Sequence, residues 1–236
     1  MKLGVNIDHI ATLRNARGED EPNLIEAAKI ALNEDILALT MHLREDRRHI
    51  KDLDLYEVKK LGAKINLEMA AVEEIQKIAL DLLPYSVCIV PERREEITTE
   101  GGLDVAGQKE YLKKFIKPLK EAGILVSMFI DADIKQVEAS SYIGADYIEM
   151  HTGSFAHAFK QGIYKKELEK LKSAANHAQK LGLKVNAGHG LNYDNVYLMK
   201  EIDGLCELNI GHSIISRSVF VGLKSAISQM LELMNN

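Results

Sequence analysis

The chain has 236 residues, a length that a single (β/α)₈ barrel commonly uses for one domain. Its 30 basic and 35 acidic residues give a formal charge of −5, and 46% of the residues are hydrophobic, which is ordinary for a folded protein with a core. These values exclude a disordered chain, a collagen-like chain and a generally basic nucleic-acid binder.

Two features of the sequence favour a cytoplasmic protein. Only two cysteines are present, Cys88 and Cys206, and neither stands beside another cysteine, so we expect no disulfide framework and a reducing compartment. The apolar run at the N-terminus is too short for a signal peptide, and the longest apolar stretches fall well below the ~20 residues needed to cross a bilayer. We therefore expect no secretion signal, no membrane span and no nucleic-acid partner.

Short runs rich in valine, isoleucine and leucine recur along the chain at intervals of about thirty residues, the length of one βα unit. These runs predict parallel strands, because continuous rather than alternating apolar residues suit strands that are covered on both faces. In chain order the predicted strands are Leu3–Asp8, Ile36–His42, Lys64–Met69, Ser86–Pro91, Leu125–Asp131, Asp146–His151, Lys184–Ala187 and Leu205–Gly211.

Segments with helical spacing lie between and after these strands, and Gly123 and Gly182 stand where a left-handed residue would end a helix before a strand. The predicted helices are Asn23–Leu32, Leu53–Leu61, Val72–Leu82, Ala106–Ala122, Ile134–Ile143, Lys165–Leu181, Asn192–Glu201 and Ser213–Leu233. An open doubly wound sheet is the alternative, but no Gly-x-Gly-x-x-Gly turn follows the first strand. We therefore predict a (β/α)₈ TIM barrel in which residues 1–236 form one domain.

Polar residues gather at the carboxyl ends of the predicted strands, which in such a barrel form one mouth. Five of the eight histidines lie at these ends: His9, His42, His151, His189 and His212. Together with Glu68 and Glu149 they provide the acids and bases that a reaction with several proton transfers needs. The pattern predicts general acid–base catalysis at the mouth.

Two regions of the mouth have the character of anion sites. Small residues around His189 and His212 lead into helix starts after the last two strands, where backbone N–H groups can face a phosphate. After the second strand, Arg44 is the best candidate for a phosphate contact, while Arg47 and Arg48 fit a solvated loop equally well. Two anion sites suggest two phosphorylated substrates.

The polar stretch 98–105 contains a Gly-Gly pair and predicts a loop that closes over the mouth, although a merely flexible surface loop fits the same residues. No lysine is expected at the mouth, because Lys64 and Lys184 begin their strands, so a Schiff-base lysine is disfavoured. A divalent metal remains an alternative, although no His-x-His or His-Glu-x-x-His spacing supports it. The residues that it would use are Asp8, His9, Glu68, Glu149 and His151. A non-catalytic scaffold would leave the gathered ionisable groups unexplained.

Long blocks of the sequence resemble the pyridoxine 5′-phosphate synthase family, the ring-closing enzymes of vitamin B6 synthesis. The first block reads GVNIDHIATLRNAR, and further blocks lie at residues 42–50, 66–70, 98–108, 129–133, 181–191 and 207–212. Two segments depart from the family pattern: residues 33–39 replace a Gly-Ala-Asp-Gly turn, and residues 154–164 match no family pattern. These departures leave the conformation of both segments open.

The resemblance implies a transferase that joins 1-deoxy-D-xylulose 5-phosphate to 3-amino-2-oxopropyl phosphate and releases phosphate and water. Neither a metal nor another cofactor is implied, since the amine of the substrate supplies the imine nitrogen. The resemblance also implies a homo-octamer, a tetramer of dimers, in which Arg17 reaches into the site of a neighbouring subunit.

Roles for individual residues follow from the same resemblance. It implies that His42 and Glu68 are bases, that His189 donates a proton, and that Glu149 stabilises a charged intermediate. The residues implied for the aminoketone phosphate are Asn6, Arg17, Gly190, Gly211 and His212. The residues implied for the deoxyxylulose phosphate are Asp8, His9, Arg44, His49 and Thr98.

Overall fold

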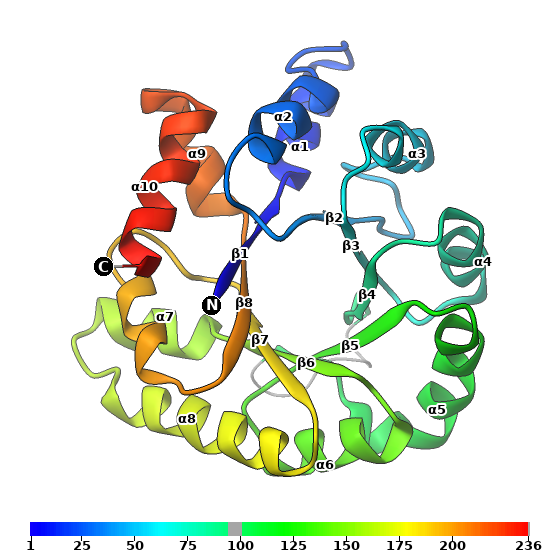
Figure 1. Cartoon of the computed structure of the whole chain (residues 1–236), viewed down its shortest axis with the longest axis vertical. Coiled ribbons are helices and arrows are strands. Elements are labelled where there is room, and N and C mark those ends of the chain that lie inside the picture. The colour runs from blue at the N-terminus through cyan, green and yellow to red at the C-terminus, as the bar shows by residue number, and fades with distance from the viewer. Residues whose placement is uncertain (94–100, 236) are drawn as a thin grey trace.

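Eight parallel strands close into a barrel in chain order, and helices surround it (Figure 1). This computed structural model describes residues 1–93 and 101–235. The strands are β1 (Lys2–Asn6), β2 (Ala38–His42), β3 (Ile65–Met69), β4 (Ser86–Ile89), β5 (Leu125–Ile130), β6 (Tyr147–His151), β7 (Lys184–Gly188) and β8 (Leu205–Ile210). Pairing of β1 with β8, in which Gly4 lies opposite Asn209, closes the barrel. The predicted TIM-barrel fold is confirmed.

The two faces of each strand bury different kinds of side chain. The outward face is apolar: Leu39 and Met41 of β2, for example, are fully buried in the core beneath the helices. The inward face is polar, and there the Thr40 hydroxyl donates to Asn209 Oδ1 at 2.8 Å. Gly4 leaves room for this contact, because a Cβ at that position would lie 2.1 Å from the same oxygen. Such polar filling differs from the bulky branched side chains that usually fill these barrels.

Most of the predicted helices form the outer ring. They are α2 (Leu24–Leu32), α3 (Asp52–Lys60), α4 (Glu73–Leu82), α5 (Val105–Glu121), α6 (Ile134–Ile143) and α8 (Lys165–Lys180). Gly123 and Gly182 follow α5 and α8 and have φ values of +79° and +82°. Both are the left-handed residues that the sequence predicted between these helices and the next strands. At the divergent turn after α2, Asn33 has φ −82°, so this turn needs no left-handed residue there.

Three short helices begin directly at strand ends: α1 (Asp8–Arg17), α7 (Gly153–Lys160) and α9 (His212–Val221). We did not predict α1 and α7, whereas α9 is the first part of the predicted helix Ser213–Leu233. Helix α1 corrects the predicted strand Leu3–Asp8, which ends at Asn6. Helix α7 places His157 on a helix rather than on a loop. All three begin at the carboxyl ends of strands and so bring helix N-termini to the mouth.

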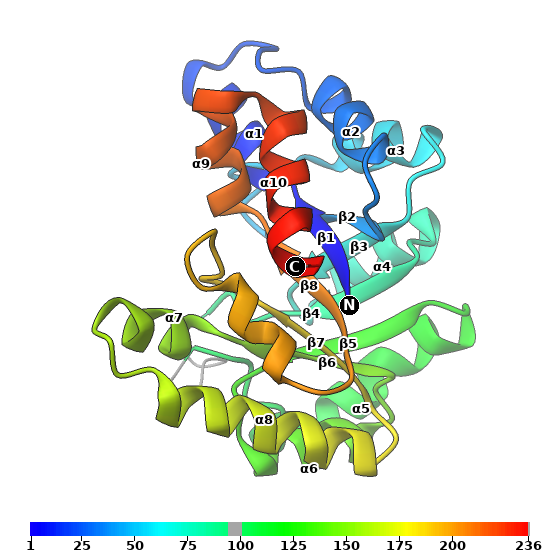
Figure 2. The same ribbon diagram turned by 60° about the vertical axis from the view of Figure 1, so that its left-hand side comes forward.

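The C-terminal part of the chain also differs from the prediction. A single helix over Ser213–Leu233 is wrong, because Gly222 (φ 82°, ψ 151°) separates α9 from α10 (Leu223–Asn235). The segment Asn192–Glu201 contains only a short 3₁₀ helix, η2 (Val196–Glu201). Figure 2 shows α9 and α10 packed beside α1 and α2 on one flank of the barrel. None of the helices in the described part of the chain has the length and apolarity of a membrane span.

Candidate active site

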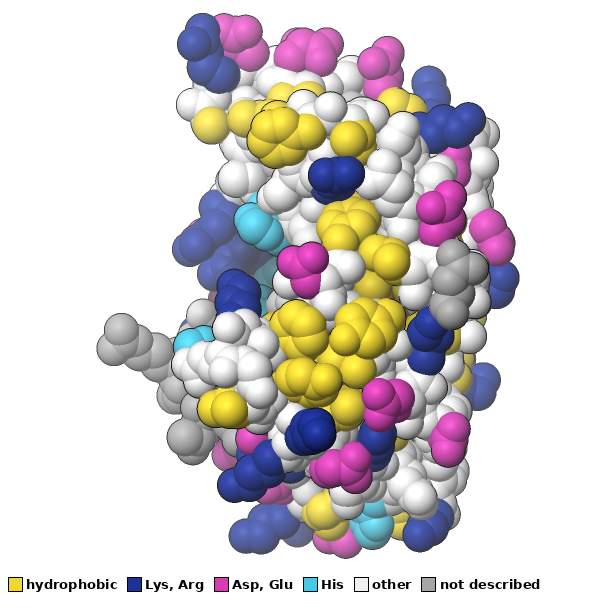
Figure 3. All heavy atoms as spheres, turned by 90° about the vertical axis from the view of Figure 1, so that its left-hand side faces the viewer, with side chains coloured by type: hydrophobic (Ala, Val, Ile, Leu, Met, Phe, Trp, Pro, Cys, Tyr) yellow, Lys and Arg dark blue, Asp and Glu magenta, His cyan; other side chains and the backbone are white. Residues whose placement is uncertain are grey.

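The carboxyl ends of the strands surround a cavity of about 850 Å³. Figure 3 shows histidine side chains in a hollow at the left edge of the view. Most of the predicted site residues line this cavity: Asn6, Asp8, His9, His42, His49, Glu68, Glu149, His189, Gly190, Gly211 and His212. The barrel thus brings residues from distant parts of the sequence into one hollow.

His42 lies at the end of β2 between two carboxylates. Its Nε2 is 2.9 Å from Oε1 of Glu92, and its Nδ1 is 4.0 Å from Oε2 of Glu68. Burial raises the pKa of Glu92, but the hydrogen bond and charge of His42 outweigh this, and the pKa is lowered overall. Glu92, whose side chain is 4% exposed, therefore holds the His42 ring as a charged partner. Sequence reasoning did not assign it a role.

Three carboxyl groups that interact with one another, those of Asp8, Glu68 and Glu149, line the same cavity as His42. Burial raises the pKa of Asp8 to about 6 and that of Glu149 to about 7. The pKa of Glu68 is raised well above its usual range by burial and by the charges of Glu149 and Asp8. Because these groups share one low-dielectric space, at least one holds a proton near neutrality. Such groups can both give and take protons during a reaction.

Asn6 and Asn209 fix the positions of these carboxyl groups. The Asn6 amide donates to Asp8 Oδ2 at 2.8 Å and lies 3.5 Å from Oε2 of Glu68. The Asn209 amide donates to Glu149 Oε2 at 2.6 Å. Both asparagines point into the barrel from strand positions, so the polar interior described above directly supports the site.

His189 follows β7 in an unusual backbone conformation. Its φ is +70°, a left-handed value that a residue with a side chain rarely adopts and that is worth of order 1–3 kcal/mol of strain. The Thr152 hydroxyl donates to the carbonyl oxygens of Gly188 and His189, which holds this turn in place. Burial, and then the charge of His151, lower the pKa of His189. The ring is therefore a fixed and comparatively strong proton donor when it is charged.

The N-terminus of α9 lies at the cavity, where the sequence predicts an anion site. Gly211, His212 and Ser213 line the cavity there, and backbone N–H groups of a first helical turn attract anions. A Cβ at Gly211 would lie 2.9 Å from the Asn6 side chain, so only glycine fits. His9 meets His212 edge to face at 5.1 Å between ring centroids. Burial and the charge of His212 lower the pKa of His9.

The predicted basic residues lie outside this cavity. The Arg17 side chain is 79% exposed and its Nη2 is 3.6 Å from Oε1 of Glu19. Arg44 Nη2 is 3.8 Å from Glu92 Oε2. Neither arginine lines the cavity. Thr98 lies outside the described residues, so its predicted role stays a prediction.

Only residues 101–105 of the predicted closing loop lie within the described part of the chain. Gly101 lines the cavity, while the amide of Gly102 donates to Asp131 Oδ1 at 3.0 Å. The amide of Leu103 donates to the Phe129 carbonyl at 2.8 Å, and its side chain is buried. This end of the loop is therefore anchored to the end of β5. Closure itself stays a prediction.

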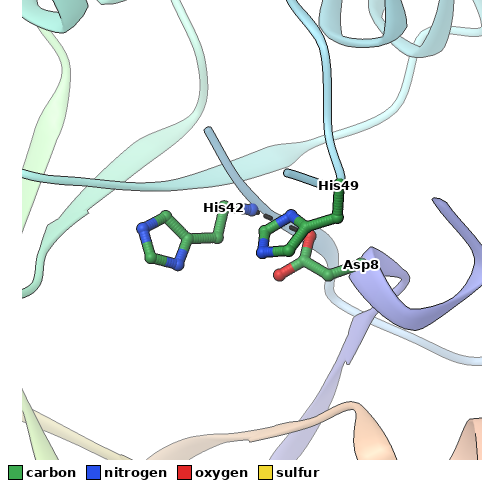
Figure 4. A group of neighbouring side chains, drawn as sticks. All are labelled: Asp8, His42 and His49. Atoms are coloured by element: carbon green, nitrogen blue, oxygen red, sulfur yellow. Dashed lines mark hydrogen bonds between the residues drawn. The ribbon is translucent and has the colours of Figure 1, made fainter. Parts of the chain in front are cut away.

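Asp8, His42 and His49 have ligand-type atoms that lie within 4.8 Å of one another (Figure 4). Both oxygens of Asp8 already accept hydrogen bonds, from the His42 amide and from Asn6. Burial and the charges of His42 and Arg44 lower the pKa of His49 to about 4, so its ring is neutral. The trio could hold a divalent cation or contact a substrate. Within residues 1–93 and 101–235, the five residues considered as a metal set do not form such a group.

Lys160 contradicts the expectation that no lysine lies at the mouth. It ends α7 and lines the cavity, where it is the single lysine or arginine among the described lining residues. No signal in the sequence indicated this position, because the segment 154–164 matched no pattern and α7 was not predicted. His151 also lines the cavity, but sequence reasoning gave it no individual role.

The sequence matches the family of the pyridoxal phosphate biosynthesis protein PdxJ over residues 3–236. The chain belongs to this family. A pyridoxine 5′-phosphate synthase of Sulfurihydrogenibium sp. (strain YO3AOP1) is 55% identical over 100% of this chain and 98% of that protein. The protein of the same name from Gluconobacter oxydans (strain 621H) is 48% identical over the full length of both. The family resemblance predicted from the motifs is confirmed.

Solved structures outside the PdxJ family share the barrel. An orotidine 5′-monophosphate decarboxylase from Methanocaldococcus jannaschii superimposes with a TM-score of 0.67 at 14% identity, covering 100% of this chain and 99% of that one. A thiamine phosphate pyrophosphorylase from Pyrococcus furiosus superimposes with a TM-score of 0.60 at 16% identity, with coverages of 99% and 95%. At this level of identity the similarity concerns the fold alone.

Proposed function

We propose that this chain catalyses the pyridoxine 5′-phosphate synthase reaction. It joins 1-deoxy-D-xylulose 5-phosphate to 3-amino-2-oxopropyl phosphate, closes the pyridine ring, and releases phosphate and water. The observation that carries this proposal is the full-length identity of 48% to 55% with PdxJ-family proteins of that name. The cavity supports it independently, because it combines several proton-transfer groups with a predicted anion site.

His42, Glu68, His189 and Glu149 carry out the chemistry in this scheme. His42 and Glu68 remove protons, which their shared position and the raised pKa of Glu68 support. His189 donates a proton to a departing group, and Glu149, whose pKa lies near neutrality, stabilises charge on an intermediate. Because both water and phosphate depart, the site needs acids as well as bases, and these four groups supply both.

The two phosphates occupy different parts of the mouth. The N-terminus of α9, with Gly190, Gly211 and His212 beside Asn6, holds the aminoketone phosphate. Asp8, His9 and His49 contact the deoxyxylulose phosphate, and Arg44 and Thr98 join them when the site is occupied. No cofactor takes part, because the substrate amine provides the imine nitrogen. The cytoplasmic location stays a prediction.

We also propose that the chain assembles as a homo-octamer, a tetramer of dimers. Apolar side chains reach the surface on the flank that carries α1 and α9: Phe220 is 83% exposed, and Val219 and Leu13 are exposed as well. Figure 3 shows apolar side chains exposed on the face that includes α9. Arg17 lies on α1, at the edge of this surface, so pairing of two copies would carry it toward a neighbouring mouth. Light scattering of wild type and Phe220→Asp tests this assembly.

The direct test of the reaction uses chelator-treated protein with both phosphorylated ketones. We expect a pyridine chromophore and free phosphate to appear together, in equal amounts, at a rate that added chelator does not change. Omission of either ketone should abolish both signals. Phosphate release without a pyridine product would contradict the proposal.

A further inference from the structure

His151 occupies a position in the mouth to which the proposed chemistry gives no task. It ends β6, its side chain is only 10% exposed, and it lines the cavity beside His189. The two imidazole rings are 4.8 Å apart between centroids, and the Phe129 ring lies against both. His151 is therefore packed directly against the proposed proton donor.

A carboxylate stands behind His151. Oδ1 of Asp131, just after β5, lies 3.4 Å from Nδ1 of His151 and also accepts a hydrogen bond from the Gly102 amide. Nδ1 of His151 is buried, and no described residue forms a hydrogen bond with it in this geometry. A buried nitrogen of this kind is costly to leave unsatisfied, and a small rotation of the ring would complete the bond to Asp131. Asp131 is thus placed to orient the ring.

Two glycines confine the His151 ring on its other sides. A Cβ at Gly153 would lie 2.7 Å from Nε2 of His151, and a Cβ at Gly101 would lie 3.0 Å from Cε1. The His151 ring therefore occupies space that the side chain of any larger residue at position 101 or 153 would fill. The next residue, Thr152, holds the backbone of His189 through its hydroxyl. His151 thus packs against the ring of His189, and the next residue, Thr152, binds the backbone of His189.

We propose that His151, backed by Asp131, is a positioning residue that holds the His189 imidazole in line for proton donation. This inference rests on the proposed role of His189 in the PdxJ-family reaction. His151 acts through His189, because its ring fills the space into which the His189 ring could otherwise turn. A misplacement of about 1 Å at a reacting group can lower a rate on the order of 10²-fold.

Charge reinforces this positioning. Among the described titratable groups, Asp131 and His189 contact His151 directly. Glu149 and Lys160 line the same cavity as His151. His157 and Glu167 line the hollow on the other side of His151. Burial, and then the charge of His151, lower the pKa of His189, which makes the charged His189 ring a stronger acid. Without His151, the pKa of His189 should rise.

The first experiment compares His151→Asn with wild type, and uses His157→Asn as the matched control. We expect kcat of His151→Asn to fall on the order of 10²-fold while KM for both substrates stays within about threefold. The limb of the pH–rate profile that belongs to His189 should move to higher pH, because a positive neighbour has been removed. His157→Asn, in the adjacent hollow, should keep wild-type values.

The second experiment disturbs the ring without removing it. Gly153→Ala introduces a methyl group that must push His151 aside, at a helix position where alanine is well tolerated. We expect kcat to fall, and we expect the same substitution to have no further effect in a His151→Ala background, where the clash is absent. Equal effects in both backgrounds would assign the loss to α7 itself and overturn the inference.

The outcomes separate this inference from the proposed function. If wild type forms no pyridine product, the proposed function fails. If wild type is active and His151→Asn keeps both its kcat and its pH profile, the positioning role fails alone. If circular dichroism shows that His151→Asn does not fold, Gly153→Ala decides, and an unchanged kcat in that variant overturns the inference.

Discussion

Around the mouth, the ends of β6, β7 and β8 place their functional groups through backbone geometry, whereas the ends of β1 and β2 depend on charged side chains. On the first side, the Thr152 hydroxyl binds the backbone of the left-handed turn at His189, and Gly211 is the N-cap residue of α9. On the second side, Arg17 and Arg44 lie outside the cavity. The first side positions its groups through hydrogen bonds within the chain. The phosphate contacts proposed for Arg17 and Arg44 would instead require these side chains to move, or a neighbouring copy to contribute Arg17.

Glu68→Gln, on β3 next to His42, is the substitution with the largest expected effect. Loss of this base should lower kcat by roughly 10²–10⁴-fold, while the glutamine keeps the shape of the side chain and therefore the fold. Steady-state kinetics with both substrates measures the change. Glu73→Gln, at an exposed glutamate on α4, is the matched control. A variant within a few-fold of wild type would remove Glu68 from the proposed mechanism.

Arg17→Ala tests whether this arginine of α1 contributes to the aminoketone phosphate site of a neighbouring subunit. If Arg17 binds the aminoketone phosphate across an interface, its loss should raise KM for that substrate about tenfold, as expected for one charge-assisted hydrogen bond. KM for the other substrate should stay constant. Arg48→Ala, another exposed arginine, serves as the control. Unchanged kinetics in a variant that still assembles would exclude Arg17 from the site.

The barrel could be predicted from the sequence because each strand carries apolar residues on its outer face and ends in polar ones. The short helices α1 and α7 could not, because each follows its strand with almost no intervening loop. Asp8, for example, directly follows Ile7 at the end of the predicted strand, yet it is the first residue of α1. A pattern of hydrophobicity does not show where such a strand gives way to a helix.

The gathering of His42, Glu68 and His189 in one cavity was predictable from their strand positions, because a barrel brings all strand ends to one mouth. Their individual catalytic roles came from the family resemblance and stay predictions. The contacts between side chains were not predictable. Glu92 holds His42 across about 50 residues of sequence, and Lys160 enters from a helix that no pattern indicated. Residues that depend on rotamers or on unpredicted helices carry no positional signal in one sequence.

Lys160→Gln sharpens the comparison on the β6 side. If Lys160 helps the N-terminus of α9 to bind the aminoketone phosphate, its loss should raise KM for that substrate by about threefold. The effect is small because an exposed charge contact contributes less than ~1 kcal/mol. The kcat value should stay unchanged. Lys166→Gln, at an exposed lysine of α8, is the control. An effect confined to the deoxyxylulose phosphate would place Lys160 with the β1 and β2 side instead.

Glu207 lies inside the barrel beneath the β6 to β8 side, and Glu207→Gln should change stability rather than turnover. Burial, and then the charge of Glu149, raise its pKa to about 8. Its Oε2 lies 3.5 Å from the Asn186 amide, and its Oε1 has no hydrogen-bond partner within the described chain. The folded protein therefore holds this carboxyl in its neutral form well above the pH at which an unfolded chain releases the proton.

The sign of the pH dependence follows from this raised pKa. The contribution of Glu207 to stability is complete below the unfolded pKa, near 4.5, and is lost as the pH rises toward about 8, at a rate of at most about 1.4 kcal/mol per pH unit. The free energy of unfolding of wild type should therefore fall between pH 6 and pH 8. Glu207→Gln, which is neutral throughout, should show a flatter profile, whereas Glu201→Gln, at an exposed residue just before β8, should follow wild type. Urea unfolding at fixed protein concentration, repeated across this pH range, measures the difference. If the free energy of unfolding changes with pH in the same way for Glu207→Gln and wild type, the barrel interior accepts the charged Glu207 carboxylate without loss of stability.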